Sequence, residues 1–414
     1  MKGAIVLYSI PVFFILIGLE LLINYFKHQN KYRLNDSIAN LSLGIGSQVV
    51  GTLTKVLVFG SYVWTYDHFA FIKLPDSVLV FFVCLVLYDF IYYWSHRWGH
   101  TVSLFWGAHI VHHQSEEYNL TVALRQPWFH SLIAFYLFLP LALLGFSPII
   151  LGSVAGINLV YQFWIHTEYI DKMPRWFEYI FNTPSHHRVH HAINPKYIDR
   201  NHAGMFMIWD RLFGTFQPED ENEKIRYGIT KTFGSWNPAW ANVHFYTELW
   251  DKMKLVDGLG AKLTLIFRKP GWNPVSMQED VILPPSPDML KYDKDTTSSA
   301  RIYAVVQFGI VLMGSVMFLV KYPTLSLPYK LLFAGLIIFS IEVIGGLFEN
   351  KKWAVYGEYL RLAAILLGLN WFYYFQYPNW LIYTLIFSLV LGLLSLVIYR
   401  IIQSTPVSNT ESVA

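Results

Sequence analysis

Nine apolar stretches constrain this chain more than any other feature of its sequence. A helix that crosses the hydrocarbon core of a bilayer needs about 20 mostly apolar residues. A cleaved signal peptide would have a shorter apolar run and a small-residue cleavage site, so the first stretch is interpreted as a membrane anchor. The expected spans are 4–26, 43–64, 77–94, 129–146, 148–165, 302–320, 325–347, 353–371 and 380–402. This pattern predicts an all-α integral membrane protein with about nine transmembrane helices.

Charged residues are concentrated in one part of the chain. Residues 171–298 contain 32 charged side chains in 128 positions, whereas the other 286 positions contain only 27. Soluble proteins carry about 25% charged residues, so a polar insert lies between two apolar blocks. The net charge of +3 is small and dispersed, which does not favour nucleic acid as a partner. The single cysteine, Cys84, excludes a disulfide framework and a cysteine metal site.

Basic residues predict the orientation of the spans. Lys27, Lys31 and Arg33 directly follow the first span, and loops rich in Lys and Arg remain in the cytoplasm. Counting forward from this point places the N-terminus outside, and the polar insert and the C-terminus in the cytoplasm. Lys351 and Lys352 also fall inside, as the count requires.

The same boundaries suggest a division of the chain into five segments. We predict N-terminal membrane helices at 1–76, a metal-binding domain at 77–235, a cytoplasmic segment with a linker at 236–299, a four-helix membrane block at 300–402 and a tail at 403–414.

Three histidine clusters stand out between the third span and the polar insert. Their spacings are His-x3-His, His-x2-His-His and again His-x2-His-His. Residues three and four apart share one face of a helix, and imidazole is a common metal ligand. Eight such residues exceed the needs of one mononuclear site, so two metals or a crowded pocket are expected. The cluster residues are His96, His100, His109, His112, His113, His187, His190 and His191.

An isolated histidine near a membrane boundary is more often a polar anchor than a ligand. That interpretation suits His28, His68, His130 and His244. It does not suit three clusters with repeated helical spacing, all of which the topology places on the cytoplasmic side of the membrane.

Three further residues are candidates near the clusters. His166 closes the fifth span, where polar groups are costly and usually functional, and we predict it to be a ninth ligand. Gln162 lies four residues earlier and is either a ligand or a support for one. His186 precedes the third cluster, but the spacing to His190 and His191 favours His187 as the ligand and leaves His186 in a supporting role.

The identity of the metal is less constrained. No cysteine accompanies the histidines, and the His-Glu-x-x-His and Glu-x-x-His patterns are absent. Neutral imidazoles at a membrane surface suit iron, although the ligand type alone also permits zinc or copper.

Together the three motifs resemble the fatty acid hydroxylase/sterol desaturase superfamily of membrane di-iron oxygenases. The gap of 73 residues between His113 and His187 is within the range of that family. A more extended likeness is to the alkylglycerol monooxygenases. It is carried by the segments 118–126, 161–168, 182–191 and 208–216.

The resemblance implies two iron ions, O2 and a membrane lipid whose alkyl chain is hydroxylated, with cleavage of an ether bond if the lipid is an alkylglycerol. It also implies electrons from an external donor, with tetrahydrobiopterin as a candidate cofactor. An unactivated C–H bond needs such cofactor chemistry, because no protein side chain supplies it.

Carboxylates near the clusters are candidates for orienting the ring N–H groups of the ligands. Asp89 lies seven residues before His96, two turns away on the same face of the third span, and Glu168 follows His166.

Two alternatives remain open at this stage. Within the same class, the enzyme hydroxylates or desaturates a fatty acyl chain, a sterol or a carotenoid, because the histidine pattern does not separate these substrates. In another class, the chain is a metal-binding transporter or a structural membrane protein. A transporter would need polar residues distributed across its spans, whereas these histidines gather at one face.

Overall fold

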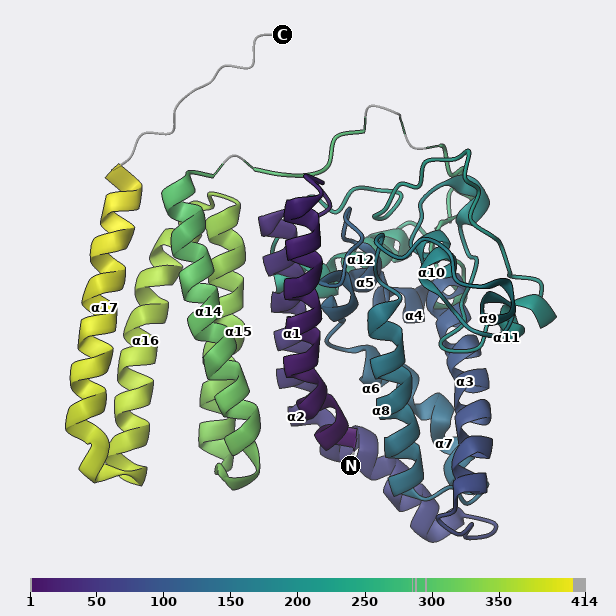
Figure 1. Cartoon of the computed structure of the whole chain (residues 1–414), viewed down its shortest axis with the longest axis horizontal. Helices are drawn as coiled ribbons and strands as arrows, with labels where there is room; N and C mark the ends of the chain where they lie inside the picture. The colour runs from purple at the N-terminus through teal and green to yellow at the C-terminus, as the bar shows by residue number, and fades with distance from the viewer. Residues whose placement is uncertain (1, 285, 287–288, 295, 405–414) are drawn as a thin grey trace. The chain divides into compact units, whose positions relative to one another are not determined.

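The computed structural model describes residues 2–404, except for residues 285, 287, 288 and 295. The described chain is almost entirely helical (Figure 1), with one hairpin of two short antiparallel strands, β1 (Trp272–Asn273) and β2 (Gln278–Glu279). The α-helices are α1 (Lys2–Phe26), α2 (Leu34–Phe69), α3 (Val78–Thr101), α4 (Ser103–Gly107), α5 (Ile110–His113), α6 (His130–Ala134), α7 (Leu139–Leu143), α8 (Pro148–Trp164), α9 (Arg175–Ile180), α10 (Pro184–His190), α11 (Ile208–Leu212), α12 (Pro238–Lys254), α13 (Leu259–Phe267), α14 (Ser298–Lys321), α15 (Leu327–Phe348), α16 (Lys352–Gln376) and α17 (Leu381–Ser404). Residues 405–414 of the predicted tail lie outside the described residues.

Five of the described helical segments are long and apolar enough to cross a membrane. They are Tyr8–Phe26, Leu34–Phe69, Val78–Thr101, Ser298–Thr324 and Leu327–Phe348. Large apolar side chains on these helices face outward; Val56 is 84% exposed and Leu79 is 74% exposed. A water-soluble protein rarely exposes so much contiguous apolar surface. The chain is therefore a helical membrane protein with several spans.

The chain divides into two compact units. The N-terminal unit comprises Met1–Ser47, Leu53–Phe233 and Trp240–Lys291, and the C-terminal unit comprises Gln48–Thr52, Gly234–Ala239 and Tyr292–Ala414.

Within the N-terminal unit, α3 packs against α8, and α8 packs against α1. Cys84 of α3 and Val154 of α8 are fully buried in this core, together with Tyr62 of α2. The short helices α9, α10 and α11 gather at one end of α3 and α8 (Figure 1). The apolar core thus holds two long helices side by side and leaves their ends free to carry polar groups.

A tight turn joins the fourth and fifth apolar stretches. Gly145 adopts a φ of +90°, and a Cβ at this position would lie 1.9 Å from the carbonyl oxygen of Ile72. Only glycine fits such a backbone. The Ser147 side chain then accepts a hydrogen bond from the backbone N–H of Ile150 and begins α8.

The C-terminal unit consists mainly of α14, α15, α16 and α17, which lie side by side in Figure 1. Each helix packs against the next one in the chain. Its interior contains a polar cluster formed by Tyr303, Gln307, Glu358 and Arg361, all of which are buried.

Candidate metal centre

The first histidine cluster lies on a helix and not beyond its end. The apolar run 77–94 predicted that the span ends before His96, but α3 continues to Thr101. His96 and His100 therefore lie on its last two turns, four residues apart on one face. Both imidazoles on this extension of the helix are buried by the protein.

The other predicted ligands lie on two short helices or just beyond the end of a helix. The second cluster, 109–113, forms α5 and the residue before it, and the third cluster, 187–191, forms the second half of α10 and the residue after it. His166 lies two residues beyond α8.

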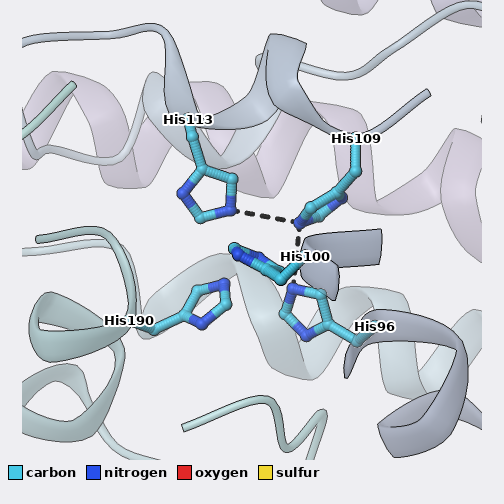
Figure 2. Close-up of side chains that lie close together, drawn as sticks. All are labelled: His96, His100, His109, His113 and His190. Atoms are coloured by element: carbon cyan, nitrogen blue, oxygen red, sulfur yellow. Dashed lines mark hydrogen bonds between the residues drawn. The ribbon is translucent and has the colours of Figure 1, made fainter. Parts of the chain in front are cut away.

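The nine predicted ligands converge in two groups, and all nine are buried. Within each group, one ring nitrogen from every residue lies within 4.8 Å of all the others. The five-histidine group, shown in Figure 2, is His96, His100, His109, His113 and His190, and the four-histidine group is His112, His166, His187 and His191.

Backbone carbonyls hold several of these rings in one tautomer. Nδ1 of His96 lies 2.8 Å from the carbonyl oxygen of His202. In the four-histidine group, Nδ1 of His112 lies 3.0 Å from the carbonyl oxygen of Arg125, and Nδ1 of His166 lies 2.7 Å from that of Gln162. A carbonyl oxygen only accepts, so Nδ1 carries the proton and Nε2 of the neutral ring carries a lone pair.

The contact between His112 and His166 therefore cannot be a hydrogen bond. Their Nε2 atoms lie 3.1 Å apart, and neither has a proton to donate. Burial lowers the pKa of His112 to about 4 and lowers the pKa of His166 well below its usual value, so neither ring gains a second proton near neutral pH. Two nitrogens bound to one metal at about 2.1 Å and at right angles lie about 3 Å apart. This geometry fits a metal ion between the two rings.

Unpaired ring nitrogens in both groups support the same conclusion. Nε2 of His100, His190 and His191 and Nδ1 of His187 have no hydrogen-bond partner among the described residues. An unpaired buried polar group costs about 1–3 kcal/mol. A metal ion would satisfy such nitrogens, and the chain could hold one in each group.

Asp89 supports the site in a way that differs from the prediction. Its carboxylate accepts hydrogen bonds from the backbone N–H groups of Met205 (2.8 Å) and Phe206 (3.0 Å) and from Nε1 of Trp209 (3.0 Å). These bonds hold the segment after α10 against α3. Asp89 therefore holds a backbone segment in place and does not accept a hydrogen bond from the N–H of a ligand ring.

The other predicted supporting residues occupy different places. Gln162 positions His166 through its backbone carbonyl, while its side chain accepts a hydrogen bond from Tyr92 (2.7 Å). Glu168 accepts a hydrogen bond from Tyr227 (3.1 Å), away from the ligand rings. His186 lies outside both groups, with Nδ1 3.3 Å from the Thr183 hydroxyl.

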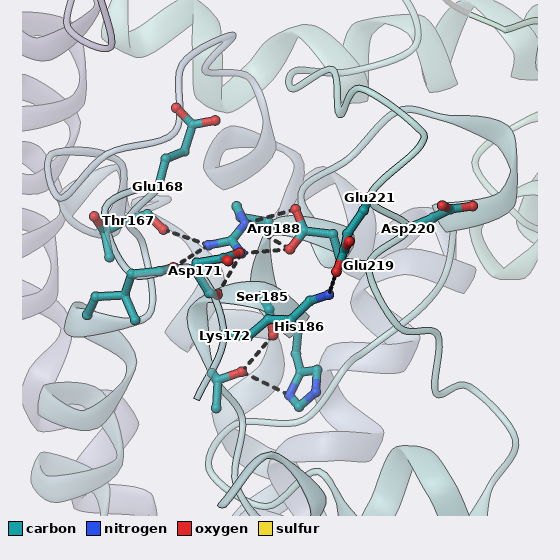
Figure 3. A network of polar contacts seen from close by, with 12 residues as sticks. Thr167, Glu168, Asp171, Lys172, Ser185, His186, Arg188, Glu219, Asp220 and Glu221 are labelled. Carbon is teal, nitrogen blue, oxygen red and sulfur yellow. Dashed lines mark hydrogen bonds and ion pairs between the residues drawn. The ribbon is translucent and has the colours of Figure 1, made fainter. Parts of the chain in front are cut away.

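Arg188 joins the third cluster to the segment that follows His166 (Figure 3). Its guanidinium donates to Glu219 Oε2 (2.6 Å) and to the carbonyl oxygens of Ile170 (2.7 Å) and Asp171 (2.8 Å). Bidentate and charge-assisted bonds of this kind are among the stronger ones. They fix the position of α10, and with it the position of His187 and His190.

One further histidine of this environment, His202, has no signal in the sequence motifs. The ring of His202 is fully buried, and its centroid lies 5.1 Å from that of His100 and 5.8 Å from those of His96 and His190. His202 lies in a loop, eleven residues after His191, so no helical spacing signals its position.

Comparisons with known proteins agree with this geometry. A fatty acid hydroxylase family model matches residues 81–215. The chain is 34% identical to the alkylglycerol monooxygenase of Danio rerio over 399 residues, which cover 95% of this chain and 88% of the relative. It is also 34% identical to the alkylglycerol monooxygenase of Homo sapiens, over 86% of this chain and 80% of that protein. No solved structure matches the chain.

These matches confirm the resemblance inferred from the histidine motifs and favour an enzyme over a transporter or a structural protein. The chain belongs to the alkylglycerol monooxygenase family, whose fatty acid hydroxylase domain makes it an O2-dependent membrane enzyme that hydroxylates lipids.

Proposed function

We propose that this chain hydroxylates the ether-linked alkyl chain of an alkylglycerol, with two iron ions held by the nine predicted histidine ligands. The single observation that carries the proposal is the convergence of nine buried imidazoles in groups of five and four. The relatives align with most of the chain, and their names support the choice of substrate. The family match at 81–215 lies within the predicted metal-binding domain, 77–235.

Two bound irons would supply the oxidising power that an unactivated C–H bond requires and that no side chain has. The carbon beside the ether oxygen gains one atom of O2, and the other atom leaves as water, with two electrons and two protons from an external reductant. The resulting hemiacetal separates into a fatty aldehyde and a glycerol. Tetrahydrobiopterin is the reductant that the family resemblance suggests.

The residues of the chain perform the remaining tasks. The carbonyls of Arg125 and Gln162 hold His112 and His166 with their lone pairs directed inward. Arg188 fixes the helix that delivers His187 and His190. Burial excludes water from the site, which protects a reactive centre from side reactions.

The test uses the purified full-length chain in lipid nanodiscs, loaded with iron. The protein is incubated with 1-O-hexadecylglycerol and tetrahydrobiopterin, either with O2 or under nitrogen, and the fatty aldehyde is trapped as a hydrazone for mass spectrometry. We expect an aldehyde product that forms only with O2, and about two irons per chain by elemental analysis. A second reaction with another two-electron reductant tests whether the pterin is required.

Matched substrates separate this proposal from the alternatives. The acyl analogue 1-hexadecanoylglycerol, sterols and carotenoids should yield no product. Hydroxylation or desaturation of one of these, with no aldehyde from the ether lipid, would assign the enzyme to that substrate instead. A chain that carries one zinc and remains inactive after iron loading would contradict the di-iron assignment.

The proposal also includes nine spans, with the metal centre at the cytoplasmic side. The basic residues Lys27, Lys31 and Arg33 support this orientation. Ligands of the metal centre lie at the C-terminal ends of both α3 and α8. This supports the count of spans, which predicts both helix ends on the same side of the membrane.

Cysteine labelling tests the orientation in a Cys84→Ala background. Ser115, which lies beside the second cluster, is buried and would not react. Lys73 and Asn222 are exposed, and the predicted orientation places them on opposite sides of the membrane. In intact cells, an impermeant reagent should label Lys73→Cys but not Asn222→Cys. The reverse pattern would place the metal centre outside the cell.

A further inference from the structure

His202 is a buried imidazole whose ring nitrogens have no hydrogen bond to any residue that the structure describes. Its exposed fraction is 0%, and neither ring nitrogen has a partner among the described residues. Buried polar groups nearly always pair with protein or with ordered water. The ring lies beside three members of the five-histidine group, at centroid distances of 5.1 Å from His100 and 5.8 Å from His96 and His190.

The backbone around His202 is held firmly in place. Asp199 and Asn201 adopt left-handed conformations, each with a φ of 56°, which Asp and Asn tolerate better than most residues. The Asn201 amide donates to the carbonyl oxygens of Gln217 (2.8 Å) and His186 (3.0 Å). The Asp210 carboxylate accepts the backbone N–H of His202 (2.8 Å).

This loop presents two backbone carbonyls and one imidazole to the five-histidine group. The carbonyl oxygen of His202 accepts the Nδ1 proton of His96 (2.8 Å), and the carbonyl oxygen of Arg200 accepts that of His190 (3.0 Å). The unpaired imidazole of His202 is delivered by the same backbone that orients these two rings, so its position is fixed by the fold.

The ring nevertheless lies outside the set of converging ligands. The five histidines of the group have ligand atoms within 4.8 Å of one another, and His202 is not among them. Five imidazoles would leave one position of an octahedral metal open. A water molecule at that position would also be the missing partner of the buried ring.

We propose that His202 is a positioning residue that hydrogen-bonds to a small ligand, such as water, at the open coordination position of the five-histidine group. The inference rests on the metal centre of the proposed function. It adds a tenth histidine to that centre, one that acts on the exchangeable ligand and does not bind the metal.

Azide serves as the probe, because this small anion can replace water at an open metal position. Its dissociation constant is measured by visible absorption titration of the iron-loaded protein in nanodiscs, with iron content measured on the same samples. His202→Phe keeps the bulk of the ring and removes both nitrogens, whereas His202→Gln retains a hydrogen-bonding group. His244→Phe is the matched control, since His244 is a buried histidine outside both groups.

We expect His202→Phe to keep about two irons per chain and to bind azide about tenfold more weakly, the effect of one lost hydrogen bond to a charged ligand. His202→Gln should recover most of the affinity, and His244→Phe should match the unmodified protein. If the phenyl ring prevents folding, His202→Leu should show the same loss.

Unchanged azide affinity in a folded His202→Phe or His202→Leu variant would overturn the inference. Loss of iron from such a variant would overturn it as well, because His202 would then be a direct ligand. If the unmodified protein retains no iron, the metal centre of the proposed function fails with it, so the two failures are distinguishable.

Discussion

Both units bury a cluster of polar side chains, but the two clusters are built differently. In the C-terminal unit, Arg361 donates from Nε to Glu358 (2.7 Å) and from Nη2 to Gln307 (2.6 Å), and Tyr303 donates to Glu358. Of the described polar atoms of this cluster, Nη1 of Arg361 is the one without a partner. In the N-terminal unit, the Nε2 atoms of His112 and His166 lie 3.1 Å apart although neither ring can donate.

The difference separates a structural cluster from a binding site. Opposite charges in the C-terminal unit compensate one another, so this cluster needs no ligand. The histidines of the two groups carry no opposite charges, and four of their ring nitrogens have no partner among the described residues. A cation between the rings would satisfy such nitrogens, so buried nitrogens that converge and lack partners are the more useful sign of function.

The largest expected effect is the removal of one ligand from either histidine group. His112→Ala and His190→Ala should each abolish product formation while membrane insertion continues, because both residues lie outside the candidate spans. Aldehyde formation and iron content are measured together. His244→Ala, a buried histidine outside both groups, should keep its activity. Near-native turnover in His112→Ala or His190→Ala would remove that residue from the ligand set.

The second prediction concerns the charge pair of the C-terminal unit. Glu358→Gln leaves the Arg361 guanidinium buried without its counter-charge, which costs about 3–5 kcal/mol. Thermal unfolding in nanodiscs should reveal this loss of stability, while the iron content per folded chain stays unchanged. Combining the change with Arg361→Met should restore much of the stability. Loss of iron from the folded Glu358→Gln variant would show that the two clusters depend on each other.

A smaller and gradual effect is expected from pH on the metal-free protein. Burial lowers the pKa of His112 from 6.5 to about 4, and burial with neighbouring histidines lowers the pKa of His113 and His191 as well. Between about pH 6.5 and 4 the unfolded chain binds more protons than the folded chain, so stability falls as the pH falls.

The melting temperature of the chelator-treated protein, measured from pH 7.5 to 4.5, should therefore decrease mainly below pH 6.5. Iron-loaded protein should resist the decrease until protons displace the metal. A flat profile for the metal-free protein would indicate that water reaches the rings and that the groups are not buried as the structure shows.

Helical spacing within the sequence anticipates much of the metal environment. In each cluster, the two histidines four residues apart enter the same group, as one face of a helix requires. Adjacent residues on a helix point about 100° apart, and accordingly His112 and His113 enter different groups, as do His190 and His191. The division of the histidines into two groups was therefore already present in the paired histidines.

Local sequence determined that the chain crosses a membrane several times and that nine histidines belong together, because apolar run length and helical spacing are properties of short segments. Only the tertiary structure decided which clusters share a metal position, since that depends on how α3, α5 and α10 meet. The role of Asp89 and the presence of His202 were decided in the same way. Both depend on a loop whose path is set by backbone N–H groups that donate hydrogen bonds to Asp89 and Asp210. These two residues lie 113 and 8 positions away from His202 in the chain, and no local pattern encodes contacts of that kind.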